Sequence, residues 1–289
     1  FQKRHIQRSA FDVLPTVLAA TLRDLIFPKQ MRWDAWLDDG RGEFLFGRPI
    51  RWLVFLLGGE VVPFIIKRAG AAECADVKEI KASNITYGHR FIGQMKPGPE
   101  ITIGSFTEYS AQLAQRGVVL SRSERTDIIQ KGLVERASAN GGTIDSEAAE
   151  QSSLLEEVPD LVECPNVISG SFSEEFLTLP PEVLKTTMIH HQHFVPVVGK
   201  NHELTSTFLA VTNTSSANAD RVANNASRVL AARLRDARFF WDADRQIKLE
   251  ARLDRLDTLL FHKNLGSYKD KTVRMERLSV WIAEEVLQK

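Results

Sequence analysis

Apolar residues change their spacing near residue 213 of this chain. Before that point they form short runs, and two of these runs, residues 50–57 and 60–66, are separated only by Gly58-Gly59. A two-glycine link predicts a hairpin, because its tight turn needs positive φ. Pro63 favours an edge position for the second strand. After residue 213 the apolar residues follow one helical face, formed by Leu230, Leu234, Ala237 and Trp241.

This change predicts an α+β fold in two parts. Residues 1–213 form a body with a mixed or antiparallel sheet and hairpins, and residues 214–289 form a mostly helical portion. Spacing and stop signals predict helices over residues 10–27, 109–116, 122–139, 152–161, 246–260 and 275–286. Strands are expected over residues 167–172, 193–198 and 207–211, with a turn at 199–202.

Charge is balanced along the 289 residues, with 37 basic against 37 acidic side chains. A free-standing nucleic-acid binder usually carries a basic surplus, so any RNA contact must come from a local patch. Cys74 and Cys164 make neither a disulfide framework nor a four-ligand zinc site, which fits a reducing cytoplasm. The longest apolar run, residues 50–57, is too short for a bilayer. Because the chain opens on Phe1, we expect a fragment or a processed product.

A histidine cluster, His190, His191 and His193, suggests metal binding, since neutral imidazole is a good ligand. On a strand His191 and His193 would share a face. No HExxH or acidic ligand motif accompanies them, and polar or partly buried histidines are the favoured interpretation. We predict no metal site, and a His-dependent hydrolase is the least favoured hypothesis.

The tetrapeptide Gly88-His89-Arg90-Phe91 suits two interpretations. Its cation and rings can clamp and stack on a nucleotide. It can equally form a turn in which Arg90 pairs with a carboxylate and Phe91 packs inward, which is the interpretation we favour.

Arginines recur in the predicted helical portion. Residues 221–256 hold nine basic and five acidic side chains, a local surplus of four. Such a surface can lie along tRNA phosphates, although a mixed-charge helix is more often a solvated face. The basic set is Arg221, Arg228, Arg233, Arg235, Arg238, Arg245, Lys248, Arg252 and Arg255.

Several enzyme signatures are absent from the sequence. It contains no phosphate loop, no dinucleotide-binding turn and no nucleophile elbow. Adjacent acids such as Glu156-Glu157 and Glu174-Glu175 point apart on a helix or strand and make poor acid–base pairs. We therefore predict no catalytic residue in this chain.

A series of separated segments resembles the β subunit of bacterial glycyl-tRNA synthetase of the tetrameric α2β2 type, in the part preceding its HD-type domain. The matching segments occur in order at residues 27–33, 48–54, 88–91, 154–158, 161–165, 176–184, 228–240 and 265–274. Two departures stand out. Asn225-Ala226-Ser227 replaces the family's Gly-Asn-Glu, leaving Ser227 as a helix N-cap candidate, and His193 stands where an aromatic residue is usual.

The resemblance implies a cytoplasmic α2β2 ligase that activates glycine with ATP and transfers it to the 3′ end of glycine tRNA. The α subunit would hold ATP, Mg²⁺ and glycine, and the β subunit would contribute tRNA binding, so no cofactor is expected in this chain. The residues predicted to contact tRNA are His89, Arg90, Arg228, Arg233, Arg235 and Arg238.

Two hypotheses compete for the role of this segment. It either orients the tRNA acceptor region against the partner subunit, or it is purely architectural and contacts the α subunit without touching RNA. Exposed Trp33, Trp36 and Trp52 would favour the architectural hypothesis, since aromatic anchors dominate interface energetics. The plain alternative is that all three tryptophans are core residues.

Overall fold

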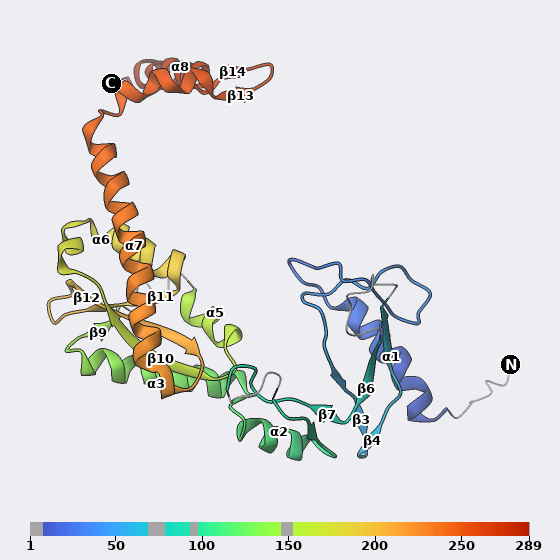
Figure 1. Ribbon diagram of the computed structural model, residues 1–289. Coiled ribbons are helices and arrows are strands. Elements are labelled where there is room, and N and C mark those ends of the chain that lie inside the picture. Colours follow the sequence, from blue (N-terminus) through green and yellow to red (C-terminus); the bar gives the residue numbers. More distant parts are fainter. Residues whose placement is uncertain (1–7, 69–78, 93–97, 146–152, 289) are drawn as a thin grey trace. The chain divides into compact units, whose positions relative to one another are not determined.

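The computed structural model describes residues 8–68, 79–92, 98–145 and 153–288 (Figure 1). Helices and several small sheets confirm the predicted α+β class. The chain divides into two compact units. Unit 1 comprises the residues up to 136 with 155–168 and 211–219, and unit 2 comprises 137–154, 169–210 and the residues from 220 onward. The predicted domain division at residue 213 is a single cut, and it stays a prediction.

Unit 1 contains short strands and most of the early helices. Its helical elements are α1 (Ala10–Asp24), α2 (Phe106–Ala114), most of α3 (Arg122–Ala139) and nearly all of α5 (Leu154–Leu161). Its strands are β1 (Ala35–Trp36), β2 (Leu53–Val54), β3 (Leu56–Leu57), β4 (Glu60–Val61), β5 (Ile65–Arg68), β6 (Glu79–Ser83), β7 (Ile85–Thr86) and β8 (Ile101–Thr102). Helix α3 has the predicted bounds, whereas α1 ends three residues earlier than predicted.

The hairpin predicted at Gly58-Gly59 is present. Strands β3 and β4 pair antiparallel with Leu57 opposite Glu60. Both glycines have positive φ, +60° and +88°, the conformation that a two-residue primed turn requires. Four other strands form a sheet in the order β1-β5-β6-β2, in which only the β2–β6 pair is parallel. The sheet of unit 1 is therefore mixed, as predicted.

The core of unit 1 forms under this sheet. Its centre is Trp33 and Phe44, whose rings lie 5.9 Å apart, together with Ile66. A smaller apolar cluster joins Ile101, Ile103 and Leu113. These two clusters anchor the loops that carry the candidate site.

Unit 2 combines a sheet with the C-terminal helices. Its elements are β9 (Thr143–Ile144), β10 (Pro165–Ser171), η1 (Glu174–Thr178), α6 (Pro181–Thr186), η2 (Thr187–His191), β11 (Phe194–Val198), β12 (Leu204–Asn213), α7 (Ala219–Gln246), η4 (Glu250–Thr258), β13 (Leu260–His262), β14 (Gly266–Ser267), α8 (Tyr268–Trp281) and η5 (Ile282–Val286). Strands β10 and β12 begin or end in unit 1. The 3₁₀ turn η3 (Ser216–Asn218), which precedes α7, belongs to unit 1.

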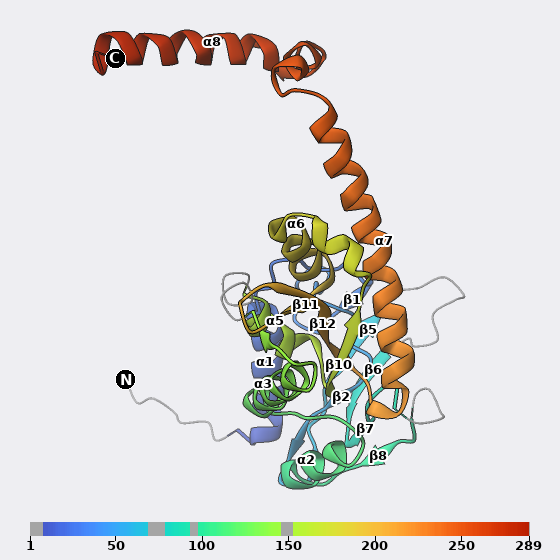
Figure 2. The same cartoon turned by 90° about the vertical axis from the view of Figure 1, so that its left-hand side faces the viewer.

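The second sheet has the order β10-β12-β11-β9. Phe208 on β12 stacks on Phe194 of β11, with ring centroids 4.5 Å apart. The first half of α7 lies beside this sheet (Figures 1 and 2). There the Ser171 N–H donates to Ser227 Oγ at 3.1 Å, and Leu230 and Leu234 are fully buried.

Three local expectations were wrong. Ser227 lies well inside α7, because the helix already begins at Ala219, and its hydroxyl serves the sheet contact. Residues 250–258 form a 3₁₀ helix, and residue 260 already pairs in β13. His193, predicted to begin a strand, has φ of +55° and links the π-helical turn η2 to β11, which begins only at Phe194. None of the described helices is long and apolar enough to cross a membrane.

Candidate nucleic-acid interface

The tetrapeptide Gly88-His89-Arg90-Phe91 packs against the end of α2. A Cβ on Gly88 would lie 2.6 Å from Arg116 Cβ, so only glycine fits this close approach. The His89 N–H donates to the Arg116 carbonyl at 3.1 Å. The following Gly117 has φ of +75°. Both glycines thus serve the turn, in line with the structural interpretation of this motif.

His89 is buried, with 3% of its surface exposed. The Phe91 N–H donates to Nδ1 at 3.2 Å, which places the ring proton on Nε2. Nε2 then donates to Asn213 Oδ1 at 2.9 Å. The same oxygen accepts the N–H groups of Glu163 and Cys164, both at 2.9 Å. His89 therefore has a structural position, and its predicted RNA contact has no exposed ring to support it.

Arg90 and Phe91 point outward. The Arg90 guanidinium carbon lies 5.6 Å from the centre of the Phe91 ring, and 55% of Phe91 is exposed. Within the described part of the chain, Arg90 makes no ion pair. The inward packing expected for Phe91, and the carboxylate partner expected for Arg90, were therefore wrong.

These two side chains line a cavity of about 620 Å³ in unit 1, which we call the aromatic cavity. Trp52 meets Tyr87 edge to face, with ring centroids 4.9 Å apart, and the Tyr87 hydroxyl donates to Glu100 at 3.2 Å. Burial raises the pKa of Tyr87, and the Glu100 carboxylate adds to the rise. The lining consists of Arg51, Trp52, Thr86, Tyr87, Gly88, Arg90, Phe91, Gly98, Tyr109, Leu113, Val118, Leu120 and Glu163.

Glu163 and Tyr109 close another part of the lining. Burial raises the pKa of the Tyr109 hydroxyl, and the nearby Glu163 carboxylate raises it further. The neighbouring Cys164 thiol also has its pKa raised by burial. These hydroxyl and thiol groups are therefore protonated at neutral pH, and none is poised as a nucleophile.

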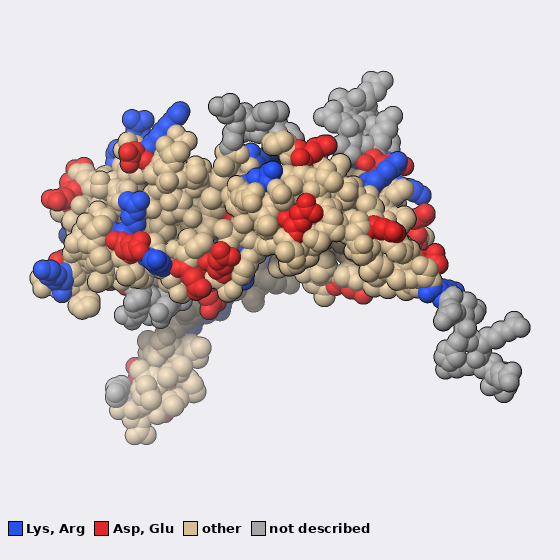
Figure 3. Space-filling model, turned by 90° about the horizontal axis from the view of Figure 1, so that it is seen from below, with Lys and Arg blue, Asp and Glu red and all other residues tan. Residues whose placement is uncertain are grey.

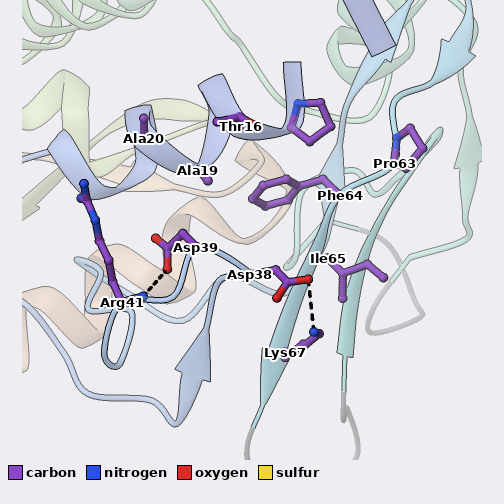
Figure 4. A pocket seen from close by; sticks show the side chains of 11 residues that line it. Thr16, Ala19, Ala20, Asp38, Asp39, Arg41, Pro63, Phe64, Ile65 and Lys67 are labelled. Atoms are coloured by element: carbon purple, nitrogen blue, oxygen red, sulfur yellow. Dashed lines mark hydrogen bonds and ion pairs between the residues drawn. The ribbon is translucent and has the colours of Figure 1, made fainter. Parts of the chain in front are cut away.

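A second cavity, of about 660 Å³, lies between α1 and the loop around residue 40 (Figure 4). Both of its carboxylates have partners: Lys67 Nζ lies 3.4 Å from Asp38, and the backbone N–H of Arg41 donates to Asp39 at 3.0 Å. The Arg23 guanidinium holds Asp39 with two hydrogen bonds of 2.9 and 3.2 Å, and this contact lowers the pKa of Asp39. The arrangement has the character of a structural ion-pair network.

Arginines of α7 fall into two groups. Arg238 Nη1 pairs with Glu175 at 3.2 Å, and its guanidinium lies 4.6 Å from the centre of the Phe176 ring. Arg228, Arg233 and Arg235 are exposed, and within the described residues they make no ion pair. Arg228 and Arg235 are seven residues apart, about two turns, on the side opposite the buried Leu230 and Leu234.

The three histidines lie at the end of the π-helical turn η2 and just after it. His190, His191 and His193 are all exposed. Across the residues with described positions, no group of three His, Cys, Asp or Glu side chains is arranged to hold a metal ion. Cys74 lies outside those residues.

The three tryptophans have different environments. Trp33 is a core residue and Trp36 is half-buried, whereas 42% of Trp52 is exposed. Sequence reasoning missed that Trp52 and Arg51 join Arg90 and Phe91 at one cavity. Their place in the matched segment 48–54 was the available signal. Asn213, which ties the cavity together, carried no signal of its own.

Charges of both signs share the face of the molecule seen from below (Figure 3). On the face shown in Figure 3, basic and acidic side chains are interspersed rather than separated by sign. Because the chain is also neutral overall, contact with phosphates depends on local groups such as the exposed arginines of α7.

Comparison with known proteins places these features in a family. A sequence model described as "Glycyl-tRNA synthetase beta subunit" matches residues 1–289. Three relatives carry the name glycine–tRNA ligase beta subunit. The protein from Moorella thermoacetica is 38% identical over 278 residues, covering 96% of this chain. The protein from Clostridioides difficile is 36% identical over 275 residues (95%), and that from Bacillus subtilis is 35% identical over 282 residues (98%).

The chain spans little more than a third of these relatives, 36% of the first two and 38% of the third. Within that span the similarity is nearly continuous. The resemblance found in the separated segments is therefore confirmed: the chain belongs to the glycyl-tRNA synthetase β-subunit family.

Proposed function

We propose that this chain is part of the β subunit of a glycine–tRNA ligase and that it supports the attachment of glycine by positioning tRNA. The observation that carries the proposal is the set of three exposed, unpaired arginines on α7, Arg228, Arg233 and Arg235, in a member of this family. A guanidinium without a carboxylate partner is available to phosphate, which it binds in a bidentate manner.

The geometry of α7 suits an extended phosphate backbone. Leu230 and Leu234 fix one side of the helix against its own unit. Arg228 and Arg235 lie about two turns apart along one exposed face, and Arg233 projects from a different face. Each phosphate neutralised by a cation releases condensed counterions, so even three contacts give a measurable, salt-dependent affinity. Because the chain as a whole is neutral, this affinity depends on the local cluster.

The remaining assignments extend the same proposal. Glycine activation with ATP and Mg²⁺ would occur on a separate α subunit in a cytoplasmic α2β2 assembly, and this segment would supply no catalytic group. Assembly is a second proposed role. Phe239 and Phe240 are both exposed on α7, and adjacent exposed aromatic residues favour a protein contact.

The test is a titration with glycine tRNA at two salt concentrations. Charge reversal of Arg228, Arg233 and Arg235 to Glu should weaken binding at least tenfold and should lower the salt slope by roughly 2–3. The matched control reverses Lys263, Arg274 and Arg277, which are exposed cations beyond α7 and give the same change in net charge. Equal losses in both variants would show a general charge effect and would contradict a role for α7.

A further inference from the structure

The aromatic cavity presents an exposed indole ring. Trp52 is 42% exposed, and it meets the Tyr87 ring edge to face at an interplanar angle of 65°. The Tyr87 hydroxyl is held by Glu100, which limits rotation of the pair. Exposed and fixed aromatic faces are the platforms on which unpaired bases stack.

Two cations accompany the rings. Arg51 and Arg90 line the same cavity and are exposed, and within the described residues neither makes an ion pair. The cavity of Figure 4 is different, because its Lys67 and Asp38 already form a pair. Free positive charge beside aromatic faces suits a ligand that carries both a flat ring and an anionic group.

The cavity walls are tied to one atom. Asn213 Oδ1 accepts hydrogen bonds from His89 and from the N–H of Glu163. Glu163 lines the cavity, and His89 lies between Gly88 and Arg90, which line it as well. A site held in this way loses little conformational freedom on binding. Its volume of about 620 Å³ lies within the range for small-molecule pockets and suits a single nucleotide rather than a duplex.

We propose that the aromatic cavity binds one unpaired nucleotide of RNA, with its base against Trp52 and its phosphate at Arg51 or Arg90. This inference rests on the proposed function, and it names the part of the RNA that this site takes. A base inside a duplex has both faces covered by its neighbours, so only an unpaired nucleotide can use the cavity.

Glu163 gives the site a preference among bases. Its carboxylate lines the cavity and makes no hydrogen bond or ion pair within the described residues. A carboxylate repels phosphate and accepts N–H groups, so it faces the edge of the base. Cytosine presents an amino donor where uracil presents a carbonyl oxygen. The cavity should therefore prefer cytosine over uracil.

The experiment measures binding of the chain to oligo(C), to oligo(U) and to a blunt RNA duplex of equal charge. Trp52→Ala should weaken oligo(C) binding by about tenfold, as expected for the loss of one stacked base. Duplex binding should not change. Phe106→Ala and Arg32→Ala are matched controls, because both residues are exposed in unit 1 and neither lines the cavity. Glu163→Gln should reduce the preference for oligo(C).

The outcomes separate this inference from the proposed function. Unchanged oligo(C) binding in the Trp52→Ala variant would overturn the cavity site, while loss of tRNA binding in the α7 triple variant would leave the proposed function intact. Conversely, if Trp52→Ala lost oligo(C) binding and the α7 triple variant bound tRNA normally, the cavity site alone would be supported. A chain that binds no RNA at low salt would overturn both.

Discussion

The sheet of unit 2 and the segment that follows Leu234 differ in how much they bury. On the sheet, Val195, Val197, Phe208 and Leu209 are all buried. From residue 235 to residue 288, a fully described stretch, Ser267 is the only buried residue. Both regions have regular apolar patterns in the sequence. An apolar stripe can predict a helix, as it did for α7, but it does not show that anything covers the stripe within the same chain.

The consequence is that stability and binding are divided between the regions. Residues packed on the sheet maintain the fold. Exposed apolar residues farther along, such as Leu278 and Trp281 on α8, are available for a contact outside the described chain. The following predictions test this division, from the largest expected effect to the smallest.

The largest effect should come from Phe208. Its side chain is 0% exposed and stacks on Phe194, so Phe208→Ala should lower the free energy of unfolding by about 3–5 kcal/mol. Leu278 is 56% exposed, and Leu278→Ala should change it by less than about 0.5 kcal/mol. Urea unfolding followed by circular dichroism measures both. A loss above about 1 kcal/mol for Leu278→Ala would show that its stripe is covered.

The next effect concerns Asn213. Asn213→Ala removes the oxygen that accepts three N–H groups. It should lower the free energy of unfolding by about 2–4 kcal/mol, because the donors are left without that acceptor. Asn213→Asp retains an acceptor and should cost less. In the C-terminal segment, Ser267→Ala removes an N-cap and should cost about 1 kcal/mol. Equal losses at Asn213 and Ser267, again from urea unfolding, would contradict the comparison.

Local features of the fold were predictable from the sequence. Gly58-Gly59 specified its hairpin because the turn depends on neighbouring residues alone. Helix α3 ends where Asn140-Gly141-Gly142 stops it, and Gly141 adopts φ of +76°. In such cases the determining interactions are close in sequence.

Long-range features were not predictable. His89 and Asn213 are 124 residues apart, and nothing near either residue indicates that they meet. The aromatic cavity combines the segments around Trp52, Phe91 and Glu163 for the same reason. Helical spacing likewise could not reveal that Arg238 is paired while Arg235 is not, because Glu175 belongs to a distant segment.

A third prediction compares two ion pairs. Asp39 is largely buried beside Arg23, and Asp39→Asn should cost about 1–2 kcal/mol at neutral pH. Because this pairing lowers the pKa of Asp39 below its ordinary value of 3.8, the stabilisation is complete above that value and is lost as the pH falls through the lowered pKa. The difference between wild type and variant should therefore shrink in acid.

The control pair is Lys269 and Asp254 in the C-terminal segment, which are 2.8 Å apart but exposed. Lys269 lowers the pKa of Asp254 as well. Any stabilisation from this pair would therefore have the same sign as that from Arg23 and Asp39, and it would also be lost in acid. Solvent screens this pair, and Asp254→Asn should have no detectable effect on unfolding at physiological salt. A cost equal to that of Asp39→Asn would contradict the division between packed and exposed regions.

The smallest effect locates the boundary between the regions within α7. Arg238 donates to the carbonyl of Glu175 and lies over the Phe176 ring, so Arg238→Ala should lower stability by about 0.5–1 kcal/mol. Arg235 has no ion pair within the described residues, and Arg235→Ala should leave stability unchanged. Binding of glycine tRNA should show the opposite order, with a loss for Arg235→Ala and little change for Arg238→Ala. If one variant lost both properties, packing and RNA contact would depend on the same face of α7, and the separation of roles along this helix would be wrong.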